Sequence, residues 1–229
     1  MGEFDQNQGF YNVDIVMCID ATGSMAPIID EVKANALTFH KEFQKRMDIE
    51  GKTVDKLRIK VIVFKDYICD TEPMKESRFF TLPADGEEFK RFVNGIEPTG
   101  GGDTPENALE AIALALKSDW TKAPGKKRHV VLMFTDAPAL PLQERKDCPG
   151  YPSGMPRNLA ELGDWWAGME QIDSTYDYRW GRLIIFAPEA TPWVEMDAWN
   201  KHWYTRSAAG TGLEELDMED VYTVLVGSM

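Results

Sequence analysis

The chain has 229 residues, of which 43% are hydrophobic and 28% charged, as expected for one large soluble domain. Its formal net charge of -13 argues against nucleic-acid binding, because phosphate contacts need a basic surface. The first residues lack the features of a signal peptide, and no apolar run reaches the roughly 18 residues of a membrane span. With three cysteines and no CxxC spacing, these features predict a cytoplasmic protein without membrane contact.

The stretch from Tyr11 to Met25 organises the chain. Residues 13–19 form an apolar run, which predicts a central strand buried on both faces of a parallel sheet. The run stops at Asp20, and Thr22 and Ser24 follow in the turn. Ligands of open α/β sheets bind at the carboxyl ends of the strands, so the sequence places three oxygen-bearing side chains where a site is expected.

Strand and helix patterns alternate after this turn. A helical pattern opens at Pro27 and continues to Met47 before Gly51 breaks it. Further strands are expected at 57–64, 78–82, 128–134, 183–186 and 203–205, and further helices within 84–96 and at 108–116, 159–172, 193–199 and 214–225. Pro83 suits an edge position for the strand before it, and Pro105 stands where a first helical position is expected. The alternation predicts a mostly parallel sheet with helices on both faces.

No domain boundary interrupts the pattern, so we expect a single domain over residues 1–229 with its core at about 11–227. A Pro/Gly-rich loop insertion runs from about 137 to 158 and begins beside Asp136. We expect this loop to form part of the rim of the site. Dense Trp and Tyr residues between 165 and 204 indicate mainly core packing, with a docking surface as the alternative.

Oxygen donors converge from three loops of the predicted fold. Three consecutive glycines precede Asp103 and Thr104, and Asp136 follows the apolar strand at 128–134. The full set is Asp20, Thr22, Ser24, Thr104 and Asp136. Carboxylates and hydroxyls without His or Cys are hard ligands, which suit Mg²⁺, Mn²⁺ or Ca²⁺ rather than zinc. Only two of the five side chains are formally charged, and five ligands leave positions of the coordination shell to water, so an incoming carboxylate could complete the coordination.

These positions resemble the metal site of the von Willebrand factor A (vWA) domain family. Asp20-Ala21-Thr22-Gly23-Ser24 is similar to its DxSxS or DxTxS motif. GGGDTPEN around Thr104 and FTDAP around Asp136 resemble the remaining two segments. The resemblance implies a three-layer, Rossmann-like vWA fold with one antiparallel edge strand and a metal-ion-dependent adhesion site (MIDAS). DATGSM and GGGDTPEN look like the stand-alone bacterial members, which implies a stress-response or signalling complex.

The resemblance also implies roles for the five residues. Thr22, Ser24 and Thr104 would contact the ion, while Asp20 and Asp136 would act largely through bound water. From this we predict a non-catalytic module that binds a protein partner, whose Asp or Glu completes the Mg²⁺ (or Mn²⁺ or Ca²⁺) site. The sequence does not predict an oligomeric state.

Other interpretations of the motifs stay open. Thr22 or Ser24 could cap the following helix, and Asp136 could be an N-cap. The glycine-rich segment could cradle phosphate, although it lacks the P-loop lysine. Asp20 could be a phosphotransfer nucleophile. A Ser-His-Asp triad finds no support, since the three histidines, His40, His129 and His202, adjoin no motif.

Two alternative functions use the same residues. The first is an Mg-dependent hydrolase or phosphotransfer enzyme, with Asp66, Asp70 or Asp103 as its base. The second is a subunit of an ATPase-coupled remodelling complex, which needs a separate motor because this chain has no P-loop.

Overall fold

The computed structural model describes residues 10–68, 70–101 and 105–229. Within them, seven strands form one sheet in the order β3-β2-β1-β5-β6-β7, with β4 also paired to β2. The strands are β1 (Phe10–Asp20), β2 (Thr53–Phe64), β3 (Met74–Glu76), β4 (Phe80–Leu82), β5 (Lys126–Phe134), β6 (Gly181–Pro188) and β7 (His202–Ser207). The long strands are parallel, and the short β3 and β4 pair antiparallel with β2 at the edge. The expected α/β fold, with its antiparallel edge, is confirmed.

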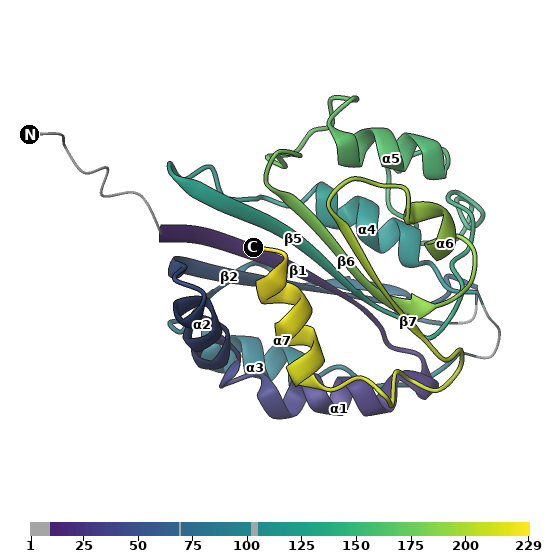
Figure 1. Cartoon of the computed structure of the whole chain (residues 1–229). Helices are drawn as coiled ribbons and strands as arrows, with labels where there is room; N and C mark the ends of the chain where they lie inside the picture. The colour runs from purple at the N-terminus through teal and green to yellow at the C-terminus, as the bar shows by residue number, and fades with distance from the viewer. Residues whose placement is uncertain (1–9, 69, 102–104) are drawn as a thin grey trace, which may run out of the picture.

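Helices cover both faces of this sheet (Figure 1). On one face lie α1 (Ala26–Asn35), α2 (Phe39–Ile49), α3 (Gly86–Asn94) and α7 (Met218–Gly227). On the other lie α4 (Ala108–Leu116), α5 (Leu159–Ala167) and the short α6 (Trp193–Met196). A single 3₁₀ turn, η1 (Gly23–Met25), joins β1 to α1. Among the described residues, no helix is long and apolar enough to cross a membrane.

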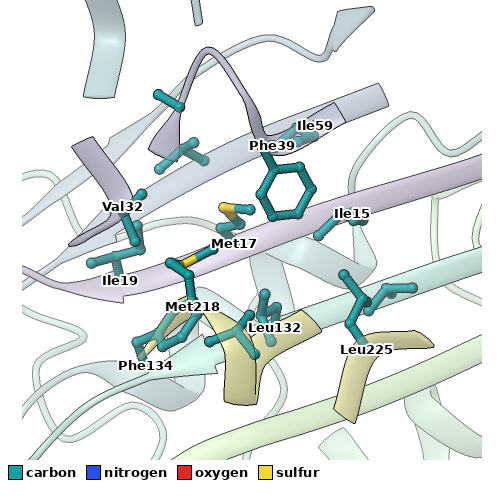
Figure 2. Close-up of a cluster of buried hydrophobic side chains, with 14 of the residues drawn as sticks. Ile15, Met17, Ile19, Val32, Phe39, Ile59, Leu132, Phe134, Met218 and Leu225 are labelled. Carbon is teal, nitrogen blue, oxygen red and sulfur yellow. The ribbon is translucent and has the colours of Figure 1, made fainter. Parts of the chain in front are cut away.

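Strand β1 supplies side chains to the cores on both faces. Ile15, Met17 and Ile19 belong to the cluster that includes α1, α2 and α7, and Figure 2 shows them in one group with Phe39, Met218 and Leu225. Val16 and Cys18 point the other way, into the cluster of α4, α5 and α6. Successive side chains of a strand face opposite sides. This two-sided burial confirms the central position that the apolar run predicts.

Several predicted boundaries are wrong. The pattern from Pro27 to Met47 is two helices, because Asn35 and Thr38 form a tight turn between them. Thr38 Oγ1 donates to Asn35 O at 3.2 Å, and Asn35 Nδ2 donates to Glu31 O at 2.9 Å. These side-chain bonds compete with the helical ladder. The helix at 159–172 ends at Ala167, where Met169 N bonds back to Asp164 O at 2.8 Å.

Two further expectations about helix starts are wrong: Pro105 is not a first helical position, for a tertiary reason, and the C-terminal helix starts later, for a local one. Helix α4 begins at Ala108, because Glu106 stays extended and bridges the loop after β5. Glu106 N donates to Pro138 O at 3.1 Å, and Leu140 N donates to Glu106 O at 2.8 Å. Pro105 is therefore outside the helix. Helix α7 begins at Met218 rather than near Glu214, since Asp217 caps it through Asp220 N at 2.9 Å.

Candidate metal centre

Four of the five predicted ligands lie in the described residues, and three of these belong to the end of β1 and the turn after it. Asp20 is the last residue of β1, and Thr22 and Ser24 follow before α1. Asp136 lies just after β5, the parallel neighbour of β1. Because the carboxyl ends of parallel strands share one edge, both acids come to the same edge of the sheet. Thr104 lies outside the described residues, as does Asp103.

Asp20 is held by neutral donors. Its Oδ1 accepts from Thr22 N at 2.9 Å and from Thr22 Oγ1 at 2.8 Å. Its Oδ2 accepts from Thr135 Oγ1 at 2.7 Å. Burial raises the pKa of Asp20 to about 6, against the opposing effect of these bonds, and the charge of Asp136 adds to the rise. The influence of Asp136 on this pKa indicates that the two carboxylates are electrostatic neighbours.

The hydroxyl oxygens of Thr22 and Ser24 lie 3.4 Å apart. Two oxygens at right angles around one ion lie roughly 2.9 Å apart for Mg²⁺ and roughly 3.5 Å apart for Ca²⁺. The observed spacing is close to the Ca²⁺ value and about 0.5 Å wider than the Mg²⁺ value. Thr22 is buried, whereas Ser24 is exposed and can meet an incoming group. The donor set therefore fits a hard divalent cation, with Ser24 on the open side.

Asp136 is fixed by the loop that precedes α7. Gly212 N donates to Asp136 Oδ2 at 2.8 Å, and Gly210 N donates to Asp136 O at 2.9 Å. Gly212 has φ +65°, and a Cβ there would clash with Ser24 O. Only glycine allows the backbone at position 212 to come this close to Ser24 O. The loop before α7 therefore closes one side of the centre, where it contacts both Asp136 and Ser24.

The glycine-rich segment before Thr104 closes another side. Gly100 O accepts from Gly23 N at 3.3 Å, and Ala21 O accepts from Thr99 N at 3.1 Å. At Gly101, with φ +78°, a Cβ would stand 2.8 Å from the Cβ of Thr22. This segment thus packs directly on the turn that carries Thr22. That contact brings the described part of GGGDTPEN to the centre, as the sequence predicts.

The capping interpretations of these residues are wrong for the described geometry. Neither η1 nor α1 receives a side-chain cap bond, so Thr22 and Ser24 do not act as N-caps. Asp136 bonds to the loop before α7, and no helix of the described chain begins beside it. Thr135 and Gly212 are the residues that sequence reasoning missed. Thr135 could have been noticed as a hydroxyl at the end of a buried strand, whereas nothing local marks Gly212.

The insertion at 137–158 lies at the same edge of the sheet as the candidate ligands. Arg145 donates to both oxygens of Asp66, Nε to Oδ1 at 3.2 Å and Nη2 to Oδ2 at 3.0 Å. Tyr151 donates to Glu110 Oε1 at 2.7 Å. The loop is thereby tied to the segment after β2 and to α4. Its position supports the expectation that it borders the centre.

Aromatic residues of the last third are mainly structural. Trp165, Trp166 and Trp193 are buried, and Trp193 Nε1 donates to Ala137 O at 3.0 Å. Tyr178 is among the exposed residues. Core packing is thus confirmed for these three tryptophans, one of which supports the strand end that carries Asp136.

Comparisons with known proteins agree with this geometry. A family model for the von Willebrand factor A domain matches residues 14–147. The alpha-protein kinase vwkA of Dictyostelium discoideum is 28% identical over 185 residues, 78% of this chain and 28% of the kinase. A putative ariadne-like RING finger protein, R811 of Acanthamoeba polyphaga mimivirus, is 27% identical over 126 residues, 55% of this chain and 11% of that protein.

A solved pilus adhesin, SpaC from Lactobacillus rhamnosus GG, superposes with a TM-score of 0.54 at 10% identity. The match covers 94% of this chain and 30% of the adhesin. At this identity the likeness shows the fold alone. The chain spans less than a third of the length of each of these proteins.

Proposed function

The chain belongs to the von Willebrand factor A domain family, and on this premise we propose that it is a non-catalytic protein-binding module. It captures an Asp or Glu of its partner through a divalent cation, Mg²⁺ or a similar hard ion, at the centre formed by Asp20, Thr22, Ser24 and Asp136, with Thr104 as the fifth ligand. The ion, when bound, supplies positive charge and a free coordination position for the partner's carboxylate.

One observation carries this proposal: Asp20 is fully buried and is held by neutral donors alone in the described residues. A buried carboxylate costs free energy unless a positive charge offsets it. The hydroxyls of Thr22 and Ser24 stand beside this carboxylate and add no charge. The centre therefore favours a bound cation, and the exposed Ser24 leaves an approach for the partner.

The contacts of Asp66, one of the possible general bases, support the non-catalytic part of the proposal. Asp66 is buried and bonded bidentately by Arg145, so it does not face the centre as a free base. The matched relatives, a kinase and a RING finger protein, exceed this chain in length severalfold. A module that recruits a partner to a signalling complex suits that setting. The narrower expectations of a stand-alone bacterial type, a stress-response complex and a cytoplasmic location stay predictions.

Metal-dependent thermal stability tests the centre. Magnesium at ten times its Kd should stabilise the fold by about 1.4 kcal/mol, which raises Tm by about 3–6 °C for a chain of this size. Asp20→Asn should abolish this rise while the fold survives, because an amide can accept from Thr22 and donate to the Thr135 hydroxyl. Asp55→Asn, the same change at an exposed site near the start of β2, is the matched control. An equal rise of Tm with Mg²⁺ in both variants would contradict the proposed metal centre.

Partner capture tests the rest of the proposal. A lysate passed over the immobilised protein with Mg²⁺ should yield a partner that EDTA releases and that Asp20→Asn fails to retain. Retention that is the same with EDTA would contradict ion-bridged binding. A phosphoester panel with Mg²⁺ checks the catalytic alternative, since turnover that Asp20→Asn abolishes would show an enzyme.

A further inference from the structure

A polar cavity of about 390 Å³ adjoins the turn that follows β1. Ala21, which lies between Asp20 and Thr22, forms part of its lining. Its other walls come from the segment after β2 and from the end of α3 with the residues that follow. The volume is within the range of about 300–1,000 Å³ that is typical of ligand pockets. The cavity therefore adjoins the turn of the candidate centre through Ala21, although no described candidate ligand lines it.

The cavity is joined to the turn of the centre by backbone contacts. Thr99, on its wall, donates its N–H to Ala21 O at 3.1 Å. Asp70, on the opposite wall, packs so closely on Gly100 that a Cβ there would clash with Asp70 Oδ1. Gly100 O in turn accepts from Gly23 N at 3.3 Å. Asp70 is thus connected to the turn of the centre through Gly100, which contacts both Asp70 and Gly23.

Charges on the cavity wall leave an acidic surplus. Lys75 pairs with Glu72 at 3.2 Å, and Lys65 Nζ lies 3.9 Å from Asp70 Oδ1 and donates to Thr99 Oγ1 at 2.8 Å. Both lysines therefore have partners. Glu97 also lines the cavity and is exposed, and the described residues give it no salt bridge.

Asp70 is the decisive side chain. Only 10% of its surface is exposed, and in the described structure its Oδ2 atom has no hydrogen-bond partner. A buried carboxylate oxygen without a donor is costly, and most such atoms in folded proteins are satisfied by protein, water or ligand. Asp70 also lines the cavity, so a donor that enters the cavity could supply the missing hydrogen bond.

We propose that this cavity accepts a basic side chain, Lys or Arg, from the same partner that supplies the carboxylate to the metal centre. Asp70 and Glu97 would bind its charge, with the chain's net charge of -13 favouring a basic partner as a whole. The cavity then selects partners in which an acidic and a basic residue stand close together. The link to a metal-bound carboxylate rests on the proposed function, whereas the cavity's preference for a cation does not.

Fragment titration tests the cavity by itself. Methylguanidinium chloride is added to ¹⁵N-labelled protein in EDTA at constant ionic strength, with sodium acetate as the probe of opposite charge. Methylguanidinium should produce saturable amide shifts at Lys65, Asp70 and Thr99, and acetate should not. Saturable shifts with acetate only, or none with methylguanidinium, would overturn the inference.

Matched variants assign the binding to Asp70. Asp70→Asn should weaken methylguanidinium binding at least fivefold, and Asp55→Asn, a distant and equal charge change, should leave it unaltered. Glu97→Gln, at an exposed position, should weaken methylguanidinium binding two- to threefold. If Asp70→Asn does not fold, the Glu97→Gln result is the test. Wild-type affinity in both lining variants contradicts the proposal.

Peptides separate this inference from the proposed function. Two peptides carry one aspartate and, two residues away, either arginine or norleucine. With Mg²⁺, the arginine peptide should bind at least fivefold more tightly, and Asp70→Asn should remove the difference. Equal Mg²⁺-dependent binding of both peptides overturns the cavity inference alone, and binding that persists in EDTA overturns the proposed function alone. If neither peptide binds, the methylguanidinium result decides the cavity.

Discussion

Strand β1 carries two buried aspartates whose surroundings differ in one respect. Asp14, in its first half, is bonded by Arg58 Nε at 2.8 Å and Nη2 at 2.5 Å and by Thr121 N at 2.6 Å. Asp20, at its end, receives bonds from Thr22 and Thr135 alone in the described structure. The first carboxylate has an internal cation and the second does not. Asp14 is thus part of the scaffold, while Asp20 is suited to a cation from outside.

The largest expected effect comes from removal of the scaffold carboxylate. Asp14→Ala leaves Arg58 without its partner, at a position where only 16% of the arginine side chain is exposed. Loss of one partner of a buried ion pair costs about 3–5 kcal/mol. Urea denaturation should show this loss, while the Tm response to Mg²⁺ persists. If Asp20→Asn in EDTA proves equally destabilising, the contrast between the two aspartates is wrong.

A pH effect of similar size is expected near Asp14. His129, paired in register with Asp14, is fully buried and stacks on Trp120 at 5.0 Å. Burial lowers the pKa of His129 from 6.5 to about 4, although Asp14 opposes the shift. The folded state therefore favours the neutral imidazole of His129. The free energy of unfolding that this preference contributes above pH 6.5 is lost as the pH falls from 6.5 towards 4. The loss amounts to about 3 kcal/mol.

Comparison with His129→Gln isolates this contribution. The variant should lose less free energy of unfolding than the wild type between pH 7 and pH 4.5, measured by urea denaturation at each pH. If the two proteins show equal pH dependence, the loss of stability at low pH comes from the titration of groups other than His129.

A pair of glycines tests how the Asp20 region is closed. Gly212→Ala adds a Cβ against Ser24 O at φ +65° and should cost about 2–3 kcal/mol, together with much of the Mg²⁺ response. Gly210→Ala is the control, because at φ +71° its Cβ meets no atom within 4 Å. It should cost about 1 kcal/mol by backbone strain alone. Equal losses in the two variants would show that contact with Ser24 is unimportant.

The smallest expected effect distinguishes Thr22, a predicted metal ligand, from Thr135, which only holds Asp20 in place. Thr22→Val and Thr135→Val each remove one hydroxyl that donates to Asp20, at 2.8 and 2.7 Å. Each should cost about 1 kcal/mol in EDTA. Only Thr22→Val should also remove the Tm rise with Mg²⁺, since Thr135 supports Asp20 without being a predicted ligand. If Thr135→Val alone lost the Tm rise with Mg²⁺, Thr135 rather than Thr22 would be the ligand.

Local pattern and tertiary contact explain which predictions succeeded. The helix at 108–116 was predicted to the residue, since its apolar pattern has no polar competitor for the backbone. The break between α1 and α2 was missed because the apolar periodicity continues across Ala36, while Asn35 and Thr38 decide the turn. Strand β3 was missed because its three residues have no pattern of their own and depend on β2 for pairing.

Apolar runs and the points where they end are local features, and they were enough to predict that β1 is buried on both faces and that acids stand at the ends of β1 and β5. The surroundings of those acids, by contrast, depend on residues far away in the chain. Gly212 reaches Asp136 from 76 residues away, and Thr135 reaches Asp20 from 115 residues away. Such contacts depend on the packing of distant loops at one edge of the sheet, which no local pattern encodes.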